Sequence, residues 1–563
     1  MMQRLALPPL RPLTDGEKRA LWLLFGLAVV VLGAGMGLRD PWPSDEPRFA
    51  LVAHQMIDSG NWLFPHRGHE LYPDKPPFFM WMQALAWLVT RSWRVAFLLP
   101  SLIAGLGTLA LVYDLGRRLW GHRSALLAAT LLLFTLHFTY QMRNAQIDPL
   151  LVGVMTLANY GLLRHLLLGP SWRWFALGCL CAGIGVITKG VGFLVLLMLV
   201  PYVFARLRGW RALALPVGAW RWAGCLALFL LPVAGWLVPM VAVSLADGDP
   251  EHAAYMHNIL LGQTVHRYAT PSGHIHSPLY FIGVIVFDWL PLSLALPWAL
   301  PAWWRRLRRR DARFLLPLGW VLLVLVFFSL SAGKRDVYIL PALPMAALAL
   351  APLLPGLLRK PGPRRALCAL TALLGALLTA MAALALLRHP PWAQRMAADL
   401  DPRMWWVLLA MGLVGLLAAA LTRVRRAPLG WVGFATAVWL LYGLWAYPLL
   451  NGERSAADVM ARARAAAGPG TTIGLVAWKE QDLLMARGPV TEFGFLQPWP
   501  QQYRDAVAWL RAAPASRRVF ILEDAMGDCV RRDRATDLGL ANSRHWWLFG
   551  AEAVVPGCQP PGE

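Results

Sequence analysis

Residues 21–49 read "LWLLFGLAVVVLGAGMGLRDPWPSDEPRF", an uncharged apolar run that is followed at once by a charged stretch. An apolar run of this length, through residue 38, is typical of a segment that crosses a bilayer. Basic residues precede the run and no small-residue cleavage site follows it, so the sequence predicts an anchor rather than a removable signal peptide. The role of the charged stretch then depends on the side of the membrane on which it lies. The preceding basic residues are Arg4, Arg11, Lys18 and Arg19.

Similar apolar runs recur along the chain of 563 residues, of which 58% are hydrophobic and 15% charged, with a mean hydropathy of +0.49. These values exclude an ordinary soluble protein and predict a polytopic α-helical membrane protein. The net charge of +22 raises the alternative of nucleic-acid binding. The basic clusters fall between apolar runs, however, so we interpret them as cytoplasmic loops and expect no nucleic-acid partner. These clusters are 117–123, 206–211, 305–313, 359–365 and 423–426.

We predict about thirteen spans, with the N-terminus in the cytoplasm. The apolar stretch 76–89 is about fourteen residues long, which favours a helix on the membrane surface over a span. If this stretch crossed the membrane, the basic loops after it would lie outside and break the positive-inside rule. The loops expected outside are 39–94, 142–148, 246–277, 333–336 and 388–403. The predicted spans are 20–38, 95–113, 124–141, 149–163, 175–188, 190–205, 222–245, 278–299, 314–332, 337–357, 366–387, 404–421 and 429–449.

The composition changes after Leu450, which divides the chain into a membrane domain (1–450) and a C-terminal domain (451–563). Helical patterns at 453–468 and 502–514 alternate with strand-like runs at 472–478 and 518–524, so we expect a small periplasmic α/β domain. Cys529 and Cys558 lie in this domain, where an oxidising compartment would allow them to pair.

The loops expected outside share polar residues suited to a phosphorylated lipid substrate. Lysine and arginine side chains would hold the phosphate, while the lipid tail would lie among the spans. The first loop (39–94) carries Asp45, Glu46, Asp74 and Lys75, and Asp148 stands at the mouth of the fourth span. The other loops contribute His257, Arg267, Lys334 and Tyr338.

Seven motifs in these loops and spans resemble, in order, the GT-C-type membrane glycosyltransferases of the aminoarabinose (ArnT-like) transferase and protein O-mannosyltransferase superfamily. The resemblance covers about residues 40–360, and it rests on the ordered set rather than on any single motif. The motifs are "DEPRFALVAHQMIDSGNWLFP" (45–65), "YPDKPPFFMW" (72–81), "LPSLIAGLGTLALVYDLGRRLWGHRSALLAATLL" (99–132), "RNAQIDPLL" (143–151), "ITKGVGFLVLL" (187–197), "HSPLYFI" (276–282) and "FFSLSAGKRDVYILPALP" (327–344).

This resemblance implies a bacterial inner-membrane enzyme that takes a sugar, of the 4-amino-4-deoxy-L-arabinose type, from undecaprenyl phosphate. The implied acceptor is lipid A, reached from the periplasm. The resemblance assigns Asp45 as the acid of the catalytic loop and Asp148 as the second acid. It places Lys75, Arg267 and Tyr338 at the donor phosphate. Glu46, Asp74 and Lys334 are supporting candidates, and a divalent metal is left open at His257.

The implied reaction displaces polyprenyl phosphate from the anomeric carbon with inversion, so cations matter where the phosphate charge grows. A hydroxyl acceptor needs a general base, for which Asp45 is the candidate. A phosphate acceptor is already anionic and needs orientation instead, in which case Asp45 would bind an amine or hydroxyl of the sugar. The sequence leaves both roles open.

Each candidate residue also has a structural alternative. Asp45 and Asp148 would cap helices, Lys75 would extend to the membrane interface, and Tyr338 would belong to an aromatic belt. Transfer to protein hydroxyls or to another glycolipid is the alternative within the enzymes. A lipid transporter or flippase is the alternative from another class, but the charges cluster at one face and the span centres carry few acids, which argues against transport.

Overall fold

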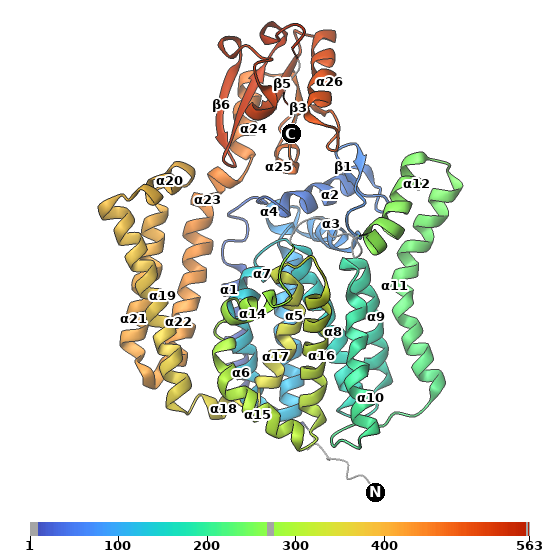
Figure 1. Ribbon diagram of the computed structural model, residues 1–563, viewed down its shortest axis with the longest axis vertical. Coiled ribbons are helices and arrows are strands. Elements are labelled where there is room, and N and C mark those ends of the chain that lie inside the picture. Colours follow the sequence, from blue (N-terminus) through green and yellow to red (C-terminus); the bar gives the residue numbers. More distant parts are fainter. Residues whose placement is uncertain (1–9, 267–274, 559–560, 562–563) are drawn as a thin grey trace.

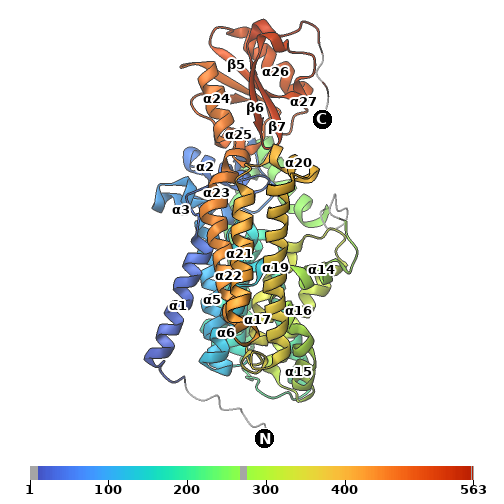
Figure 2. The same cartoon turned by 90° about the vertical axis from the view of Figure 1, so that its left-hand side faces the viewer.

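Long helices run side by side through most of the protein, and a smaller domain containing a sheet lies at one end of them (Figure 1). This computed structural model describes residues 10–266, 275–558 and 561. Helix α1 (Asp15–Gly33) begins at the opposite end from the sheet, where the side chains of Thr14 and Glu17 close a capping box. The long axis of the molecule therefore runs from the start of α1 to the C-terminal domain (Figure 2).

Six helices of the described chain are long and apolar enough to cross a membrane. A seventh results if α6 (His122–Leu133) and α7 (Leu136–Met142), which are bent by 67°, count as one span. The six are α4 (Trp93–Ala96) with α5 (Leu99–Trp120), α11 (Ala219–Ala246), α16 (Ala312–Leu330), α19 (Pro361–Arg388), α21 (Met404–Thr422), and a run formed by η5 (Val424–Arg426), α22 (Ala427–Leu441), η6 (Tyr442–Ala446) and α23 (Tyr447–Arg454).

The predicted number of about thirteen spans is therefore not confirmed. Several predicted spans are divided into short helices, and others end in charged residues. The segment 278–299 consists of α14 (Tyr280–Phe287), η3 (Ser293–Ala295) and the start of α15 (Leu296–Arg308). The segment 337–357 consists of η4 (Asp336–Ala342), α17 (Leu343–Leu350) and α18 (Leu354–Leu357). The remaining helices of the bundle are α8 (Ile147–Leu166), α9 (Trp172–Lys189), η1 (Gly192–Met198) and α10 (Leu199–Leu207).

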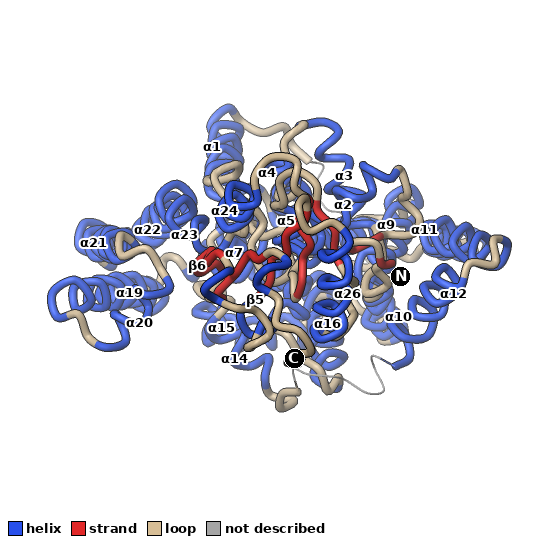
Figure 3. The backbone as a smooth tube through the Cα atoms, turned by 90° about the horizontal axis from the view of Figure 1, so that it is seen from above, coloured by secondary structure: helices blue, strands red, loops and turns tan. Residues whose placement is uncertain are grey.

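Small residues let the helices of the bundle approach closely, as is common between membrane helices. A Cβ atom added to Gly161 of α8 would lie 2.3 Å from the Trp174 carbonyl oxygen of α9. Likewise, a Cβ atom on Gly412 of α21 would lie 2.4 Å from the backbone nitrogen of Thr379 in α19. Helices α19, α21 and α22 form a group at one side of the bundle, with α11 and α12 (Pro250–His257) at the other (Figure 3).

The first loop folds into helices that lie across the upper ends of the bundle in Figure 1. Helix α3 (Phe78–Thr90) has 13 residues, so the apolar stretch 76–89 is a short helix, as predicted. Helix α2 (Glu46–Ser59) packs on α3 through Phe49 and Phe79, whose ring centroids are 5.4 Å apart. Between them lies a hairpin of β1 (His66–Arg67) and β2 (Glu70–Leu71). A further short helix, α20 (Pro391–Asp399), also lies at this end.

The C-terminal domain contains a five-stranded sheet in the order β4-β3-β5-β7-β6. The strand-like runs predicted at 472–478 and 518–524 correspond to β3 (Thr472–Val476) and β5 (Arg517–Leu522), which are parallel neighbours. The other strands are β4 (Val490–Glu492), β6 (Thr536–Ala541) and β7 (Arg544–Phe549), and the helices are α24 (Ala457–Ala467), α25 (Glu480–Leu484), α26 (Trp499–Ala512) and α27 (Glu523–Met526).

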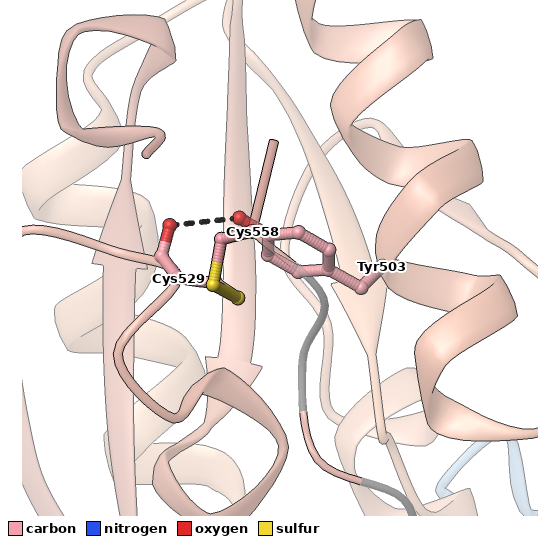
Figure 4. The surroundings of a disulfide bond; sticks show 3 residues. All are labelled: Tyr503, Cys529 and Cys558. Carbon is pink, nitrogen blue, oxygen red and sulfur yellow. Dashed lines mark hydrogen bonds between the residues drawn. A yellow bond between two sulfur atoms is a disulfide. The ribbon is translucent and has the colours of Figure 1, made fainter. Parts of the chain in front are cut away.

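Cys529 and Cys558, whose pairing the sequence left open, form a disulfide (Figure 4). The Tyr503 hydroxyl donates a hydrogen bond of 2.9 Å to the Cys529 carbonyl oxygen and so connects α26 to this bond. The C-terminal end of the chain is thereby attached to the core of the domain.

Candidate active site

Asp45 lies directly before α2, in the first loop. Its side chain makes no capping hydrogen bond, so the carboxylate is not used to hold the start of the helix. One carboxylate oxygen is 3.5 Å from the guanidinium of Arg335, and the other is 3.8 Å from that of Arg48. The side chains of Asp45 and Arg335 are 19% and 40% exposed, so a ligand can reach both. The site therefore offers an accessible carboxylate between two guanidinium groups.

Glu46, the next residue, has a different environment. Its carboxylate is buried, pairs with the guanidinium of Arg39, and accepts hydrogen bonds from the backbone nitrogens of Trp42 (2.9 Å) and Ala145 (2.8 Å). Burial alone would lower the pKa of Arg39, but the Glu46 carboxylate outweighs burial and raises that pKa above its ordinary value. These contacts are already complete, which indicates that Glu46 positions the first loop and leaves Asp45 for the ligand.

A second cluster lies where α8 begins and α9 ends. The Asp148 carboxylate, in the first turn of α8, pairs with the ammonium of Lys189, the last residue of α9. That ammonium is also 5.1 Å from the ring centroid of Tyr338. Gln146, rather than Asp148, occupies the cap position of α8. Asp148 therefore forms an ion pair with a lysine and is not the cap residue of α8, as the structural alternative assumed.

The two clusters meet in a single turn of the chain, at the start of η4. Arg335 contacts Asp45, and Tyr338 contacts Lys189. The backbone nitrogen of Tyr338 donates a hydrogen bond of 3.0 Å to the carbonyl oxygen of Arg335. The structure thus brings together Asp45, Asp148 and Tyr338 from three distant parts of the sequence.

Arg48 and Arg67 connect the first loop to Glu480, a buried residue of the C-terminal domain. A Glu480 carboxylate oxygen accepts a hydrogen bond of 2.8 Å from Arg48 and is 3.5 Å from the guanidinium of Arg67. Arg67 in turn is 3.8 Å from the carboxylate of Asp74, which precedes the half-buried Lys75. Burial would lower the pKa of Arg48, but Glu480 raises it above its ordinary value. One carboxylate therefore holds both arms of the first loop.

Further contacts attach the hairpin of the first loop to the C-terminal domain. His69 pairs with Glu492, and Glu70 accepts a hydrogen bond of 3.2 Å from the backbone nitrogen of Leu496. No role in the site was predicted for Glu480, Arg335 or Lys189. The two basic residues stand in the motifs at 327–344 and 187–197, whereas Glu480 had no local signal.

Lys334 is buried, and its ammonium donates hydrogen bonds to the carbonyl oxygens of His276 and Ser331. It therefore fixes the loop that carries Arg335, and a direct role at a phosphate stays a prediction. Arg267 lies outside the described residues.

His257 is the last residue of α12. Among residues 10–266, 275–558 and 561, no group of three or more His, Cys, Asp or Glu side chains is arranged to hold a metal ion. Metal binding by His257 thus has no support from the geometry and stays a prediction.

The arrangement has the groups that transfer from a phosphate-linked donor requires. The guanidinium of Arg335 presents several N–H donors at a partly exposed position, and such groups bind phosphate oxygens in pairs. The Asp45 carboxylate beside it can accept a proton or a hydrogen bond. The apolar helices directly below would solvate a hydrocarbon tail in the same way as the bilayer does.

Comparison with known proteins gives the following similarities. The family model described as dolichyl-phosphate-mannose-protein mannosyltransferase matches residues 74–237. An undecaprenyl phosphate-α-4-amino-4-deoxy-L-arabinose arabinosyl transferase of Pseudomonas aeruginosa (strain UCBPP-PA14) is 32% identical over 448 residues, which cover 76% of each chain. A protein of the same description from Sodalis glossinidius is 29% identical over 326 residues, so this chain spans just over half, 56%, of that relative's length.

The fold is shared with a solved protein from Cupriavidus metallidurans, the crystal structure of ArnT bound to undecaprenyl phosphate. The TM-score is 0.73 at 20% identity, and the match covers 95% of this chain and 99% of that one. The apo form of the same protein gives a TM-score of 0.74 at 21% identity, over 96% and 100% of the two chains.

Proposed function

The chain belongs to the family of undecaprenyl phosphate-α-4-amino-4-deoxy-L-arabinose arabinosyl transferases, and we propose that it moves a sugar of this type from undecaprenyl phosphate to lipid A. The family assignment makes it a glycosyltransferase of the GT-C type. The observation that carries the proposal is the meeting of Asp45, Arg335, Lys189 and Tyr338 around one turn, at the end of an apolar bundle.

In the proposed reaction, an oxygen of the acceptor forms a bond to the anomeric carbon of the sugar. The bond from that carbon to the donor phosphate breaks, and its electron pair leaves with undecaprenyl phosphate. Arg335, Lys75 and Arg267 stabilise the charge that grows on the phosphate. If the acceptor is a hydroxyl group, Asp45 takes its proton; if it is a phosphate of lipid A, no proton is transferred and Asp45 orients the sugar.

We assign Asp148 the role of holding Lys189 against Tyr338, near the donor phosphate. The contact between the ammonium and the ring supports this, because it places a cation over the ring of a tyrosine whose hydroxyl can donate a hydrogen bond. Glu46 and Asp74 act through Arg39 and Arg67, and Lys334 acts through the loop that carries Arg335.

The proposed location is the bacterial inner membrane, with the active site and the C-terminal domain in the periplasm. About thirteen segments would cross, including the bent and divided helices of the bundle. Two features support this orientation: the disulfide in the C-terminal domain, and the basic ends of α10 and α15 at the opposite end of the bundle. A membrane-impermeant thiol reagent added from the periplasm should label Asp45→Cys but not Arg308→Cys. The reverse pattern would refute the orientation.

The activity is tested with purified protein, an undecaprenyl-phosphate-linked aminoarabinose donor and lipid A. We expect sugar transfer by the wild type. If a hydroxyl group of lipid A is the acceptor, Asp45→Asn should lose about 10²- to 10⁴-fold, since a positioned acid–base group contributes about that much. If a phosphate is the acceptor, only the orienting role of Asp45 is lost, and the loss should be smaller. Asp15→Asn is the matched control, because Asp15 is an exposed carboxylate in the first turn of α1, at the other end of the bundle.

Absence of transfer to lipid A, together with transfer to a protein hydroxyl or another glycolipid, would replace the proposed acceptor but keep the donor. Equal rates in the wild type and in Asp45→Asn would remove Asp45 from the reaction. Movement of the donor lipid across the membrane of a vesicle, without transfer of its sugar to any acceptor, would favour a flippase.

A further inference from the structure

An apolar cavity of about 110 Å³ lies between α6, α18, α19 and α22, at the end of the bundle remote from the C-terminal domain. Its walls include Leu127, Leu131, Phe134, Leu354, Leu367 and Trp431. Thr130 is the one hydroxyl-bearing residue of the lining, and that hydroxyl donates to the Leu126 carbonyl oxygen at 2.8 Å. Several lining side chains, such as Leu131 and Leu367, remain partly exposed, so the cavity opens to the surroundings of the bundle.

Two basic segments border this cavity, and we call them together the basic rim. One precedes and begins α19, and the other precedes α22, with which α19 is in contact. Leu358, Pro363 and Pro428, which lie within or beside these segments, are part of the cavity wall. The guanidinium of Arg364 donates a hydrogen bond to the carbonyl oxygen of Leu358, so the rim and the wall adjoin. The rim consists of Arg359, Lys360, Arg364, Arg365, Arg423, Arg425 and Arg426.

No member of the basic rim forms an ion pair within the part of the chain that the structure describes. Other basic residues at this end do, since Arg118 pairs with Asp114 and Arg313 pairs with Asp311. Helix α22 also begins without a side-chain cap, so its N-terminal end adds positive potential beside Arg425 and Arg426. The rim therefore gathers positive charge that the protein itself does not balance.

Trp431 provides an independent observation. Its side chain lines the cavity and is 97% buried, and its indole N–H has no hydrogen-bond partner among the described residues. A buried donor without a partner is costly. The residue lies one turn into α22, just inside the basic rim. An acceptor at that depth, such as an ester oxygen, would satisfy it.

We propose that this cavity binds an anionic phospholipid, with one acyl chain in the cavity and the phosphate on the basic rim. The positive-inside rule accounts for the sign of the rim, but it does not require an open apolar cavity within it. A free phosphate ion would gain nothing from the apolar walls, and a neutral lipid would gain nothing from the rim. Basic pockets between membrane helices bind such headgroups. The proposal does not depend on the proposed sugar transfer.

The headgroup is tested by native mass spectrometry of the full-length protein with added dioleoyl-phosphatidylglycerol. We expect retention of this lipid by the wild type and a roughly thirtyfold loss in Arg425→Gln/Arg426→Gln, given a contribution of about 1 kcal/mol from each basic side chain near an anionic lipid. Arg206→Gln/Arg208→Gln, at the end of α10, is the matched control and should retain the lipid as the wild type does. Equal retention in the rim variant and the wild type would overturn the proposal.

The cavity is tested separately with Leu131→Phe, which fills it, against Leu322→Phe, which adds the same ring to an exposed position of α16. We expect Leu131→Phe alone to lower lipid retention, with an elution volume and Tm close to those of the wild type. If that variant fails to fold, Leu367→Phe tests the α19 wall instead. Equal retention of dioleoyl-phosphatidylcholine would overturn the proposal, because it would indicate hydrocarbon binding without selectivity for the headgroup. Displacement of the lipid by millimolar inorganic phosphate would also overturn it, because it would indicate a site for anions alone.

Discussion

Three arginines of the first loop are paired with buried carboxylates, whereas the arginines of the basic rim are not paired with any carboxylate in the described chain. Arg39, Arg48 and Arg67 of the first loop each face a carboxylate that is at least nine-tenths buried. No side chain of the basic rim faces any carboxylate within the described chain. The three arginines of the first loop are therefore part of the folded structure, whereas the charges of the rim are available to a ligand. The net charge of the chain alone does not reveal this difference.

The largest effect on stability is expected from Glu46→Gln, because Arg39 would be left buried and only partly compensated. Breaking a buried ion pair from one side costs about 3–5 kcal/mol, and Arg39 is 1% exposed. We expect a lower Tm and a loss of transfer that follows the loss of folded protein. Asp45→Asn, one residue away, should instead lose transfer at an unchanged Tm.

This pair of variants tests whether the first loop separates support from chemistry. An unchanged Tm in Glu46→Gln would break the comparison, since the paired charges would then not be part of the fold.

The next effect concerns Glu480, which holds Arg48 and Arg67 from the C-terminal domain. In Glu480→Gln, we expect the free energy of unfolding to fall by about 3 kcal/mol. This value is at the low end for a broken buried ion pair, because the Arg48 side chain is 28% exposed. The proposed role is to position Asp45 through Arg48, so kcat should fall more than the KM for the donor rises. Glu480→Asp, which keeps the charge, should recover part of kcat.

Asp458→Asn is a control for Glu480→Gln in the same domain, since Asp458 lies in the first turn of α24 and makes no ion pair within the described residues. If Glu480→Gln and Asp458→Asn reduced kcat equally, the contact between the C-terminal domain and the first loop would not position the site.

The apolar helices could be predicted from the sequence because helices that face lipid must be apolar over a bilayer's length. Helices α16, α19, α21 and α22 lie close to the predicted spans for this reason. The divided helices were joined in the prediction, because hydropathy does not show where a backbone bends. Asp45 could be found from its motif, but its partners could not. Arg335 is 290 residues from Asp45 in the sequence, and Glu480 is 432 residues from Arg48. Helix and strand periodicity relates only residues that are close in the sequence, so it cannot predict such pairs.

An effect that is smaller for each pH unit is expected through Asp482, beside Glu480. Burial raises the pKa of this carboxyl group to about 7, and one of its oxygens has no hydrogen-bond partner in the described chain. An unfolded aspartate ionises near pH 4. Between these values the folded state holds the additional proton, so stability falls as pH rises from 4 to 7, by at most about 1.4 kcal/mol per pH unit, and then levels.

Measurements of Tm between pH 5 and 8 test this expectation, with Asp482→Asn as the variant that removes the titrating group. The variant should show a flatter pH dependence and be the more stable protein at pH 8. A slope unchanged by the substitution would assign the pH dependence to other groups.

The smallest effect is expected at the basic rim, and it gives the sharpest test of the comparison. Arg359→Gln removes an exposed guanidinium that makes no ion pair or side-chain hydrogen bond within the described chain, so the change in unfolding free energy should stay within about 0.5 kcal/mol. Arg118→Gln, a basic residue at the same end that pairs with Asp114, is the matched control and should cost more, though under about 1 kcal/mol because both groups are partly exposed. Thermal unfolding in a neutral detergent measures both variants. If Arg359→Gln proved as costly as Glu480→Gln, the rim would be a structural element like the first loop, and its charges would not be free to bind a lipid headgroup.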